Sequence, residues 1–437
     1  MKTVFALILL STLVGSQIRA EPAASPTNAV ALTPDFLNQL AEEIRTNHPA
    51  LFAAYARTNA AAANVQAVRT WEDPVARIGG MFARQDFRAS DGDVLYGLDQ
   101  KLPLFGKPQL ARRVARAEFA TESANADYQF QILRREFAKA AFRTAFADQV
   151  VVIGEQDSAW LDTLTRLAED KVRTGQSALL EVIQLQNERA KRVNQLQTDR
   201  EQLTHDHVSL NRFLNRDPQS PWPTLTLPPL AGPVVYSQRL VDFALKYEPK
   251  TSVMRQQIAQ SEAVVNLTRR QRLPDVSVGV EARNYTGDGS FRQGALVLSM
   301  NLPWGNAGKY RSDIRREQEK LKAVEFDLAD YEAGVREELH MLTVKIDAAR
   351  RDALLYQDQI IPRTQSALEL AQTGWQTGRN TFREMLDARR MLLDVRLIYV
   401  RAVAEQYQTL SELVLCCGLG DLGALQMIGA EPADTKP

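Results

Sequence analysis

Two Gly-Lys pairs, Gly106-Lys107 and Gly308-Lys309, are the nearest approach in this sequence to a nucleotide-binding motif. A phosphate-binding loop needs a glycine five residues before the pair and Ser or Thr directly after it. Neither pair has that glycine, and Pro108 and Tyr310 follow them instead. We therefore interpret both pairs as turns at the ends of strands, not as phosphate sites.

The histidines and cysteines indicate no catalytic or metal centre. His205 and His207 are two residues apart, so on a helix they point to different sides and do not easily share a metal ion. Cys416 and Cys417 are adjacent, and a disulfide between neighbours is strained. We interpret them as two small residues at a helix end. With no Ser/His/Asp set in the local sequence either, we expect no enzyme, no bound metal and no cofactor.

One pair of acids is spaced for joint action. Glu384 and Asp387 are three residues apart, so they lie on the same face of a helix. Glu181 is their counterpart earlier in the chain, where Gln184 replaces the second acid. Acids in the first turns of a helix are also favoured by the helix dipole alone. The spacing by itself leaves both interpretations open.

The sequence repeats its own pattern about 200 residues later. The matched positions are Pro49 with Pro249, Pro74 with Pro274, Gly79 with Gly279, Leu98 with Leu298, Leu102 with Leu302, Pro103 with Pro303, Gly175 with Gly378 and Glu181 with Glu384. A duplication of this length predicts two copies of one large unit and not a short solenoid repeat.

Each half begins with a helix, expected from Pro34 to about residue 70 and from Ser237 to Arg272, and contains a much longer one. Between Pro108 and Pro218 there is no proline, and the only glycines are Gly154 and Gly175. Charged and apolar residues interleave there, which is typical of a long helix with a narrow apolar seam. From Pro108 to about residue 170 such a helix would be roughly 90 Å long. Pro362 divides the second long helix into two stacked parts.

A stretch at about 275–303 alternates with period two and predicts a strand hairpin. A weaker version of the pattern, clear only in its second strand, predicts another hairpin at about 74–104. One face of the 275–303 hairpin is apolar. Its residues are Val276, Val278, Val280, Leu296, Leu298 and Met300. The other face carries small or polar residues such as Ser277, Glu281 and Ser299. The polar loop Thr286–Ser290 joins the two strands.

The first 20 residues have the features of a secretory signal, with Lys2, an apolar stretch and a short cleavage motif ending at Ala20. The chain has 53 basic and 53 acidic residues, and without Lys2 and Arg19 the balance is 51 to 53. A near-neutral balance gives no support for nucleic-acid binding. The rest of the chain has no apolar run long enough for a transmembrane helix.

We therefore expect a mainly α protein with a small β part. The expected division is a signal peptide over 1–20, a flexible segment over 21–33, a first repeat over 34–216 with a turn at 175, a proline-rich connector over 217–236, a second repeat over 237–418 with a turn at 378, and a tail over 419–437.

Four strands of about ten residues are long enough to cross a bilayer when tilted. Their edges would be unsatisfied in lipid unless a barrel closes, and four strands cannot close one, so other copies of the chain must complete it. The alternative is a soluble periplasmic coiled-coil or adaptor-like protein in which the hairpins form a small sheet.

Over nearly its whole mature length the chain resembles the TolC-type outer-membrane efflux duct family. The resemblance rests on the order and spacing of Asn47–Leu51, Asp73-Pro74, Gln100–Lys107, Ile360–Pro362 and the segment from Gly378 through Glu384–Ala388. It implies a homotrimer with a 12-stranded barrel in the outer membrane and a long-helix α-barrel in the periplasm. It also implies a passive exit duct for small toxic compounds or metal ions.

The resemblance assigns roles to partners and residues. It implies docking to a periplasmic adaptor and an inner-membrane pump, of the resistance-nodulation-division type, and contact with outer-membrane lipid through the six apolar strand residues. Matching the tip motif residue by residue places Glu384, Asp387 and Glu181 at a pore gate. The same match places Gly175, Gly378 and Arg379 in the turns that meet the adaptor. For the cargo, the segment from Asp73-Pro74 to Gly106-Lys107 resembles the branch of the family that serves heavy-metal and multidrug pumps.

Overall fold

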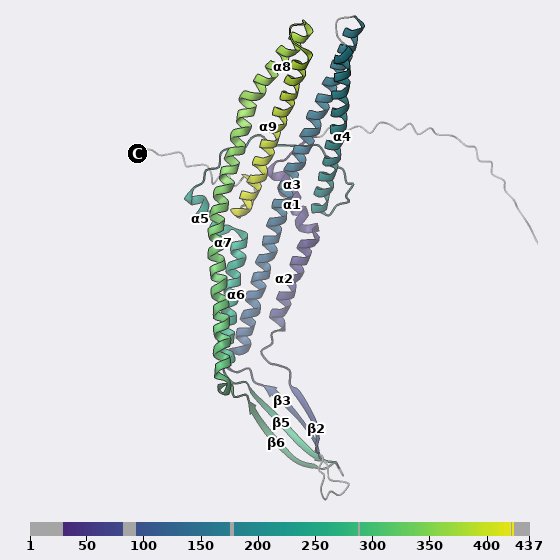
Figure 1. Ribbon diagram of the computed structural model, residues 1–437. Helices are drawn as coiled ribbons and strands as arrows, with labels where there is room; N and C mark the ends of the chain where they lie inside the picture. The colour runs from purple at the N-terminus through teal and green to yellow at the C-terminus, as the bar shows by residue number, and fades with distance from the viewer. Residues whose placement is uncertain (1–28, 82–92, 175–178, 287–288, 421, 424–437) are drawn as a thin grey trace, which may run out of the picture.

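The computed structural model describes residues 29–81, 93–174, 179–286, 289–420 and 422–423 (Figure 1). Long helices run side by side away from a four-stranded sheet at one end of the molecule, and two helical tips lie at the other end. The helices are α1 (Pro34–Asn47), α2 (Pro49–Ala67), α3 (Lys107–Arg173), α4 (Leu179–Leu214), α5 (Gln238–Tyr247), α6 (Pro249–Gln271), α7 (Ala307–Leu355), α8 (Ile361–Gln376) and α9 (Phe382–Cys416). Each half thus has two shorter helices, a long rod and a last helix, and the rod of the second half is divided into α7 and α8.

The longest helix is α3, which continues for 67 residues from Lys107 to Arg173. It is roughly 100 Å long at 1.5 Å per residue, and it reaches from the sheet almost to the tip (Figure 1). The absence of proline after Pro108 permits this length, and Pro108 itself lies in the first turn, where its missing N–H costs nothing. The prediction of one long rod in this region is confirmed.

Two helices that we expected to be continuous are each broken by a proline. The predicted helix from Pro34 to about residue 70 is divided at His48, and the one from Ser237 to Arg272 is divided at Glu248. Because a residue before proline is pushed out of the α region, both become N-caps. The His48 Nδ1 accepts a hydrogen bond from the Ala50 N–H (3.2 Å), and the Glu248 carboxylate accepts one from the Thr251 N–H (2.5 Å).

The second long rod is interrupted near Pro362, as predicted. A π-helical segment, Tyr356–Ile360, joins α7 to α8, and Pro362 stands in the first turn of α8. Proline cannot donate to the carbonyl four residues before it, and a π-turn is a common way for a helix to absorb such a defect. The rod changes its hydrogen bonding there without a loop.

The sheet is antiparallel, with strand order β2-β3-β5-β6. Its strands are β2 (Val75–Met81), β3 (Asp93–Lys101), β5 (Val276–Tyr285) and β6 (Phe291–Met300). The central pair joins the two halves of the chain, with Leu98 opposite Val280. Within the described residues, β2 and β6 each have one edge that no strand of this chain covers.

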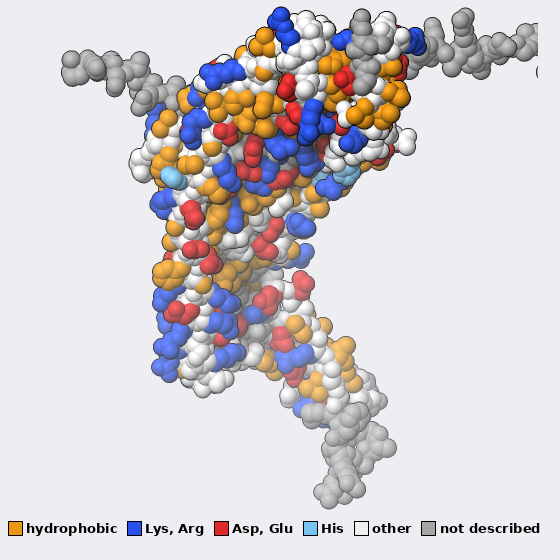
Figure 2. All heavy atoms as spheres, turned by 45° about the horizontal axis from the view of Figure 1, so that its top comes forward, with side chains coloured by type: hydrophobic (Ala, Val, Ile, Leu, Met, Phe, Trp, Pro, Cys, Tyr) orange, Lys and Arg blue, Asp and Glu red, His pale blue; other side chains and the backbone are white. Residues whose placement is uncertain are grey.

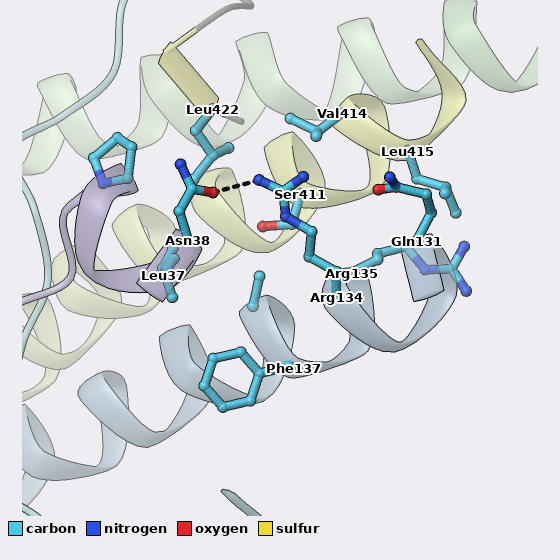
Figure 3. Close-up of a pocket in the computed structure, with 12 residues that line it drawn as sticks. Leu37, Asn38, Gln131, Arg134, Arg135, Phe137, Ser411, Val414, Leu415 and Leu422 are labelled. Carbon is cyan, nitrogen blue, oxygen red and sulfur yellow. Dashed lines mark hydrogen bonds between the residues drawn. The ribbon is translucent and has the colours of Figure 1, made fainter. Parts of the chain in front are cut away.

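The main core lies at mid-height, where α1, α3, α4 and α9 meet (Figure 1). Phe137 and Phe142 of α3 are fully buried there, and Phe142 stacks on Tyr407 of α9 at 5.0 Å. A small cavity of about 40 Å³ remains between α1, α3 and α9, next to Phe137. Figure 3 shows the Arg134 guanidinium donating to the Asn38 side chain across it.

The connector between the halves is fixed to this core by a short parallel sheet and a buried acid. Strand β1 (Val30–Ala31) pairs with β4 (Leu225–Thr226), and Asp148 Oδ2 of α3 accepts a hydrogen bond from the Leu225 N–H (2.8 Å). Burial raises the pKa of Asp148 from 3.8 to about 6, although that hydrogen bond opposes the rise. The folded state therefore binds more protons than the unfolded state between about pH 4 and pH 6.

Stability should fall as the pH rises through this window. The loss from Asp148 should be about 2–3 kcal/mol, since one pKa unit is worth about 1.4 kcal/mol. Asp148→Asn keeps an acceptor for Leu225 and removes the charge, so its unfolding midpoint should be higher than that of the wild type above pH 6 and equal at pH 4. Asp170→Asn, whose side chain is 71% exposed, is the control. Parallel pH profiles for wild type and Asp148→Asn would contradict this assignment.

Candidate functional site

One face of the sheet is apolar and open. The six residues predicted for it stand directly opposite one another across the β5–β6 ladder, as Val276–Met300, Val278–Leu298 and Val280–Leu296. Leu296 is 78% exposed and Leu298 is 64% exposed. On β2 and β3 the same face continues with Ile78, which is 85% exposed, and with Tyr96 and Leu98. Figure 2 shows hydrophobic side chains open on the surface of the sheet.

The opposite face is polar and held by ion pairs. Arg77 Nε lies 2.6 Å from Asp99 Oδ2, and Arg283 Nε lies 2.6 Å from Asp93 Oδ2. A Cβ at Gly279 would come within 2.0 Å of the Asp99 carboxylate, so the glycine makes room for the first pair. The two faces of the described sheet therefore differ in chemistry as the alternation predicts.

The first Gly-Lys pair forms a structural link between the two halves of the chain. Gly106 has φ +71°, a conformation that suits glycine, and α3 begins at the next residue. The Lys107 ammonium donates to the Leu273 carbonyl (2.6 Å) and to Asp275 Oδ1 (2.9 Å). A lysine engaged in this way by an acid and a carbonyl has no phosphate to bind, and the interpretation as a turn holds for this pair.

The second Gly-Lys pair differs from our prediction. Gly308 and Lys309 lie in the first turn of α7, not in a turn before it. The chain has already reversed through the short helix Pro303–Asn306. Lys309 is exposed, and no acid of the described chain forms an ion pair with it.

The tip turn between α8 and α9 has the geometry that glycine permits. Gly378 has φ +73°, its N–H donates to the Trp375 carbonyl (3.2 Å), and the Arg379 N–H donates to the Gly374 carbonyl (2.7 Å). Trp375 is buried against Phe382 and lies under the Lys171 ammonium of α3 at 4.0 Å. The Arg379 side chain points to solvent at the turn. Gly175 lies outside the described residues.

The predicted gate acids lie close together at the start of α9. The Glu384 carboxylate accepts a hydrogen bond from the Thr381 N–H (3.1 Å), and the Thr381 hydroxyl accepts one from the Glu384 N–H (3.3 Å). These two bonds form a capping box. Asp387, on the same face, lies 3.4 Å from Arg390 and 3.9 Å from Arg383. Glu181 is in the first turn of α4 and half-buried.

A buried ionic cluster between α3, α4 and α9 was not predicted from the sequence. Asp157 of α3 lies between Arg192 of α4 and Arg389 of α9, with all three side chains at most 13% exposed. Arg389 also lies 4.7 Å from the centre of the Trp160 ring. The only local signal was Gly154, an isolated glycine in a long helix, against which the Arg192 guanidinium packs.

Other kinds of site are not found in the described part of the chain. No group of three or more His, Cys, Asp or Glu side chains there could hold a metal ion. Cys416 ends α9, Cys417 follows it, and both are buried free thiols, as expected for small residues at a helix end. Among these residues no helix combines the length and hydropathy that a membrane span requires.

The fold and these features match known proteins. The family of outer membrane efflux proteins matches residues 40–216 and 240–419. The cobalt-zinc-cadmium resistance protein CzcC of Cupriavidus metallidurans is 24% identical over 171 residues, and this match covers 39% of our chain and 40% of CzcC. The aligned part thus spans well under half of that relative.

Solved structures of outer-membrane channels share the fold. Structures of CusC match with a TM-score of 0.77 at 15% identity, covering 93% of our chain and 97% of theirs. The outer-membrane channel OprN matches with a TM-score of 0.74 at 19% identity, covering 88% and 90%. VceC from Vibrio cholerae matches with a TM-score of 0.73 at 17% identity, covering 89% and 97%.

The match to the family over most of the chain decides between the two readings that the sequence left open. An open apolar sheet at one end and long helices at the other fit a protein anchored by its sheet in the outer membrane, with its helices in the periplasm. The chain therefore belongs to the outer membrane efflux protein family, whose members are transport channels of the outer membrane and not enzymes.

Proposed function

We propose that three copies of this chain form the outer-membrane duct of a tripartite efflux system. The duct is a passive exit for small toxic compounds or metal ions, and it docks to a periplasmic adaptor and an inner-membrane pump of the resistance-nodulation-division type. The observation that carries the proposal is the described sheet, which has one exposed apolar face and two strand edges that this chain leaves uncovered.

The trimer follows from the edges of that sheet. Backbone groups inside lipid must be paired within a closed structure, and barrels made of one chain start at about eight strands. If β6 of one copy pairs with β2 of the next, three copies close a 12-stranded barrel. In that barrel the six residues of the apolar face, including Val278 and Leu298, contact lipid, while the Arg77–Asp99 side lines the interior.

The duplication supports a specific contact between copies. Within one chain, Lys107 at the start of α3 holds Asp275, which begins the neighbouring strand pair. Lys309 holds the corresponding place at the start of α7 and lacks an acidic partner among the described residues. Asp73, before β2, is 90% exposed, and its ion pair with Arg69 is a loose one, with 3.7 Å between Arg69 Nη1 and Asp73 Oδ1. Closure of the barrel brings Lys309 of one copy to Asp73 of the next.

Cysteines at these two positions should report the assembly. In a Cys416→Ala/Cys417→Ala background, a chain with Lys309→Cys and Asp73→Cys should be cross-linked in outer membranes by a short thiol reagent to dimers and trimers. The Lys107→Cys/Asp275→Cys pair is the matched control and should cross-link only within one chain, without a change in mass. Monomers alone in the first variant would refute this interface.

The cargo proposal rests on the similarity to CzcC. Deleting the gene should lower tolerance to cobalt, zinc and cadmium, and the wild-type gene should restore it.

Gly378→Val places a β-branched residue at φ +73°, which costs roughly 1–2 kcal/mol in that conformation. Because we propose that the turns at Gly175 and Gly378, with Arg379, dock the adaptor, this variant should reach the membrane normally yet restore tolerance poorly.

Gly334→Val is the control for the docking variant. A Cβ at Gly334 in α7 would meet no atom within 4 Å, and its φ is not positive. It should restore tolerance fully. Unchanged metal tolerance after deletion would exclude these metals as cargo, and full tolerance with Gly378→Val would place the adaptor elsewhere.

We also propose that Glu384, Asp387 and Glu181 form acidic rings at the narrow periplasmic entrance. Rings of carboxylates favour cations in a pore, and a trimer would gather three copies of each acid. In this proposal the capping box of Glu384 is compatible with a position at the pore, because only one carboxylate oxygen is used by the Thr381 N–H.

Neutral substitutions should separate these roles. Glu384→Gln keeps the capping box, because Gln serves at that position as well as Glu does, and Asp387→Asn removes the second charge. The double variant should assemble normally but lose cation selectivity and block by multivalent cations in planar-bilayer recordings. Asp35→Asn/Glu42→Gln changes two exposed acids of α1, removes equal charge away from the tip and should change neither. Wild-type selectivity in the first variant would show that these acids do not line the pore.

A further inference from the structure

The ionic cluster between α3, α4 and α9 borders an open pocket of about 240 Å³. The charged residues that line the pocket are Asp157, Glu188, Lys191, Arg192, Arg389 and Arg390. The pocket joins the two helical hairpins, because α3 and α4 come from the first half of the chain and α9 from the second. Along α9 it lies farther from the tip turn than Glu384 and Asp387, and Arg390 of its lining also pairs with Asp387 (3.4 Å).

The pocket has more positive than negative charge. Its lining holds two acids and four bases. Arg389 binds Asp157 through its Nε (2.7 Å), and Arg390 binds Glu188 (2.7 Å). These two pairs leave Arg192 and Lys191 in excess. Lys191 lies 3.3 Å from Glu188 and is 74% exposed at the mouth of the pocket.

Arg192 is buried with unused donors. Its side chain is only 10% exposed, and its Nε and Nη2 atoms have no hydrogen-bond partner in the described structure. The nearest acid oxygen, Asp157 Oδ2, lies 3.5 Å from Nε, which allows attraction but no hydrogen bond. Leaving a buried charged donor unpaired costs more than leaving a neutral one. A ligand that accepts hydrogen bonds would remove that cost.

The position of this arginine is built into α3. A Cβ at Gly154 would lie 2.3 Å from Arg192 Nη2, so with any other residue there the guanidinium would have to move from its present place. Glycine inside a helix is less favourable than alanine. Gly154 is the only glycine in the 67-residue helix α3, and it leaves the space that the Arg192 guanidinium occupies.

We propose that this pocket binds a small tetrahedral oxyanion of the phosphate or sulfate class. The guanidinium fork matches two oxygens of such an ion, and a dianion balances the two excess charges of Arg192 and Lys191. Bound there, the ion bridges α4 to α9 and stiffens the junction between the two hairpins near the tip. The site does not depend on the cargo, and none of the proposed gate acids lines it.

Titration of the purified full-length protein with inorganic phosphate tests the site. At constant ionic strength set with chloride, calorimetry should show saturable binding of one ion per chain, and the unfolding midpoint should rise with phosphate. Arg192→Met should weaken binding by about tenfold or more, since a charged hydrogen bond is lost, and should abolish the rise. Its own midpoint without phosphate should equal or exceed that of the wild type, because a desolvated charge is gone.

Two further variants complete the test. Arg200→Gln removes another α4 arginine, which pairs with Glu155 of α3 (2.7 Å) outside the pocket, and should bind phosphate like the wild type. Lys191→Met changes an exposed side chain, folds independently of the buried cluster, and should weaken binding. The proposal is overturned if the wild type shows no saturable binding, if chloride gives the same rise in the midpoint, or if Arg192→Met and Lys191→Met both bind as the wild type does.

Discussion

The structure of this protein depends on one constraint, the backbone pairing of a sheet too small to close on itself. Each chain supplies the four strands β2, β3, β5 and β6, and the described sheet leaves an edge of β2 and an edge of β6 without a partner from the same chain. An unpaired edge is a liability in water and is not tolerated in lipid. The apolar face adjoining these edges is equally unfavourable in water. In the proposed trimer both costs would disappear together, because further copies would complete the sheet inside a membrane.

The helices extend away from the sheet, and specific residues determine where each helix begins and ends. Prolines at 49 and 249 set breaks that His48 and Glu248 cap, so the short helices α1 and α5 can fold back over the core at mid-height. The tip is closed by a left-handed glycine and a capping box. These caps and turns define where each long helix begins and ends, while buried apolar side chains hold neighbouring helices side by side.

The sequence predicted the parts of this fold that follow from local patterns, and it did not predict the contacts between residues far apart in the chain. The long rod α3 follows from the lack of proline, and the strand faces follow from the alternation around Val278 and Leu298. Pro49 and Pro249 are a local signal for the breaks at His48 and Glu248. The sequence analysis missed these breaks because the residues on both sides of each proline have a helical composition. The cluster of Asp157 and Arg389 joins positions 232 residues apart, and no local pattern announces such a contact.

The structure also changes which acid at the tip carries the gate hypothesis. Thr381 and Glu384 form the serine/threonine-x-x-glutamate signature of a capping box, so helix initiation alone explains a glutamate there. Capping does not explain Asp387, which lies between Arg383 and Arg390. Its charge is thus partly matched within one chain. A ring of three can favour cations only if assembly turns the carboxylates toward the axis and the arginines away from it. In the proposed trimer, cation selectivity at this entrance would therefore depend on the rotation of the helices and not on the net charge of the turn.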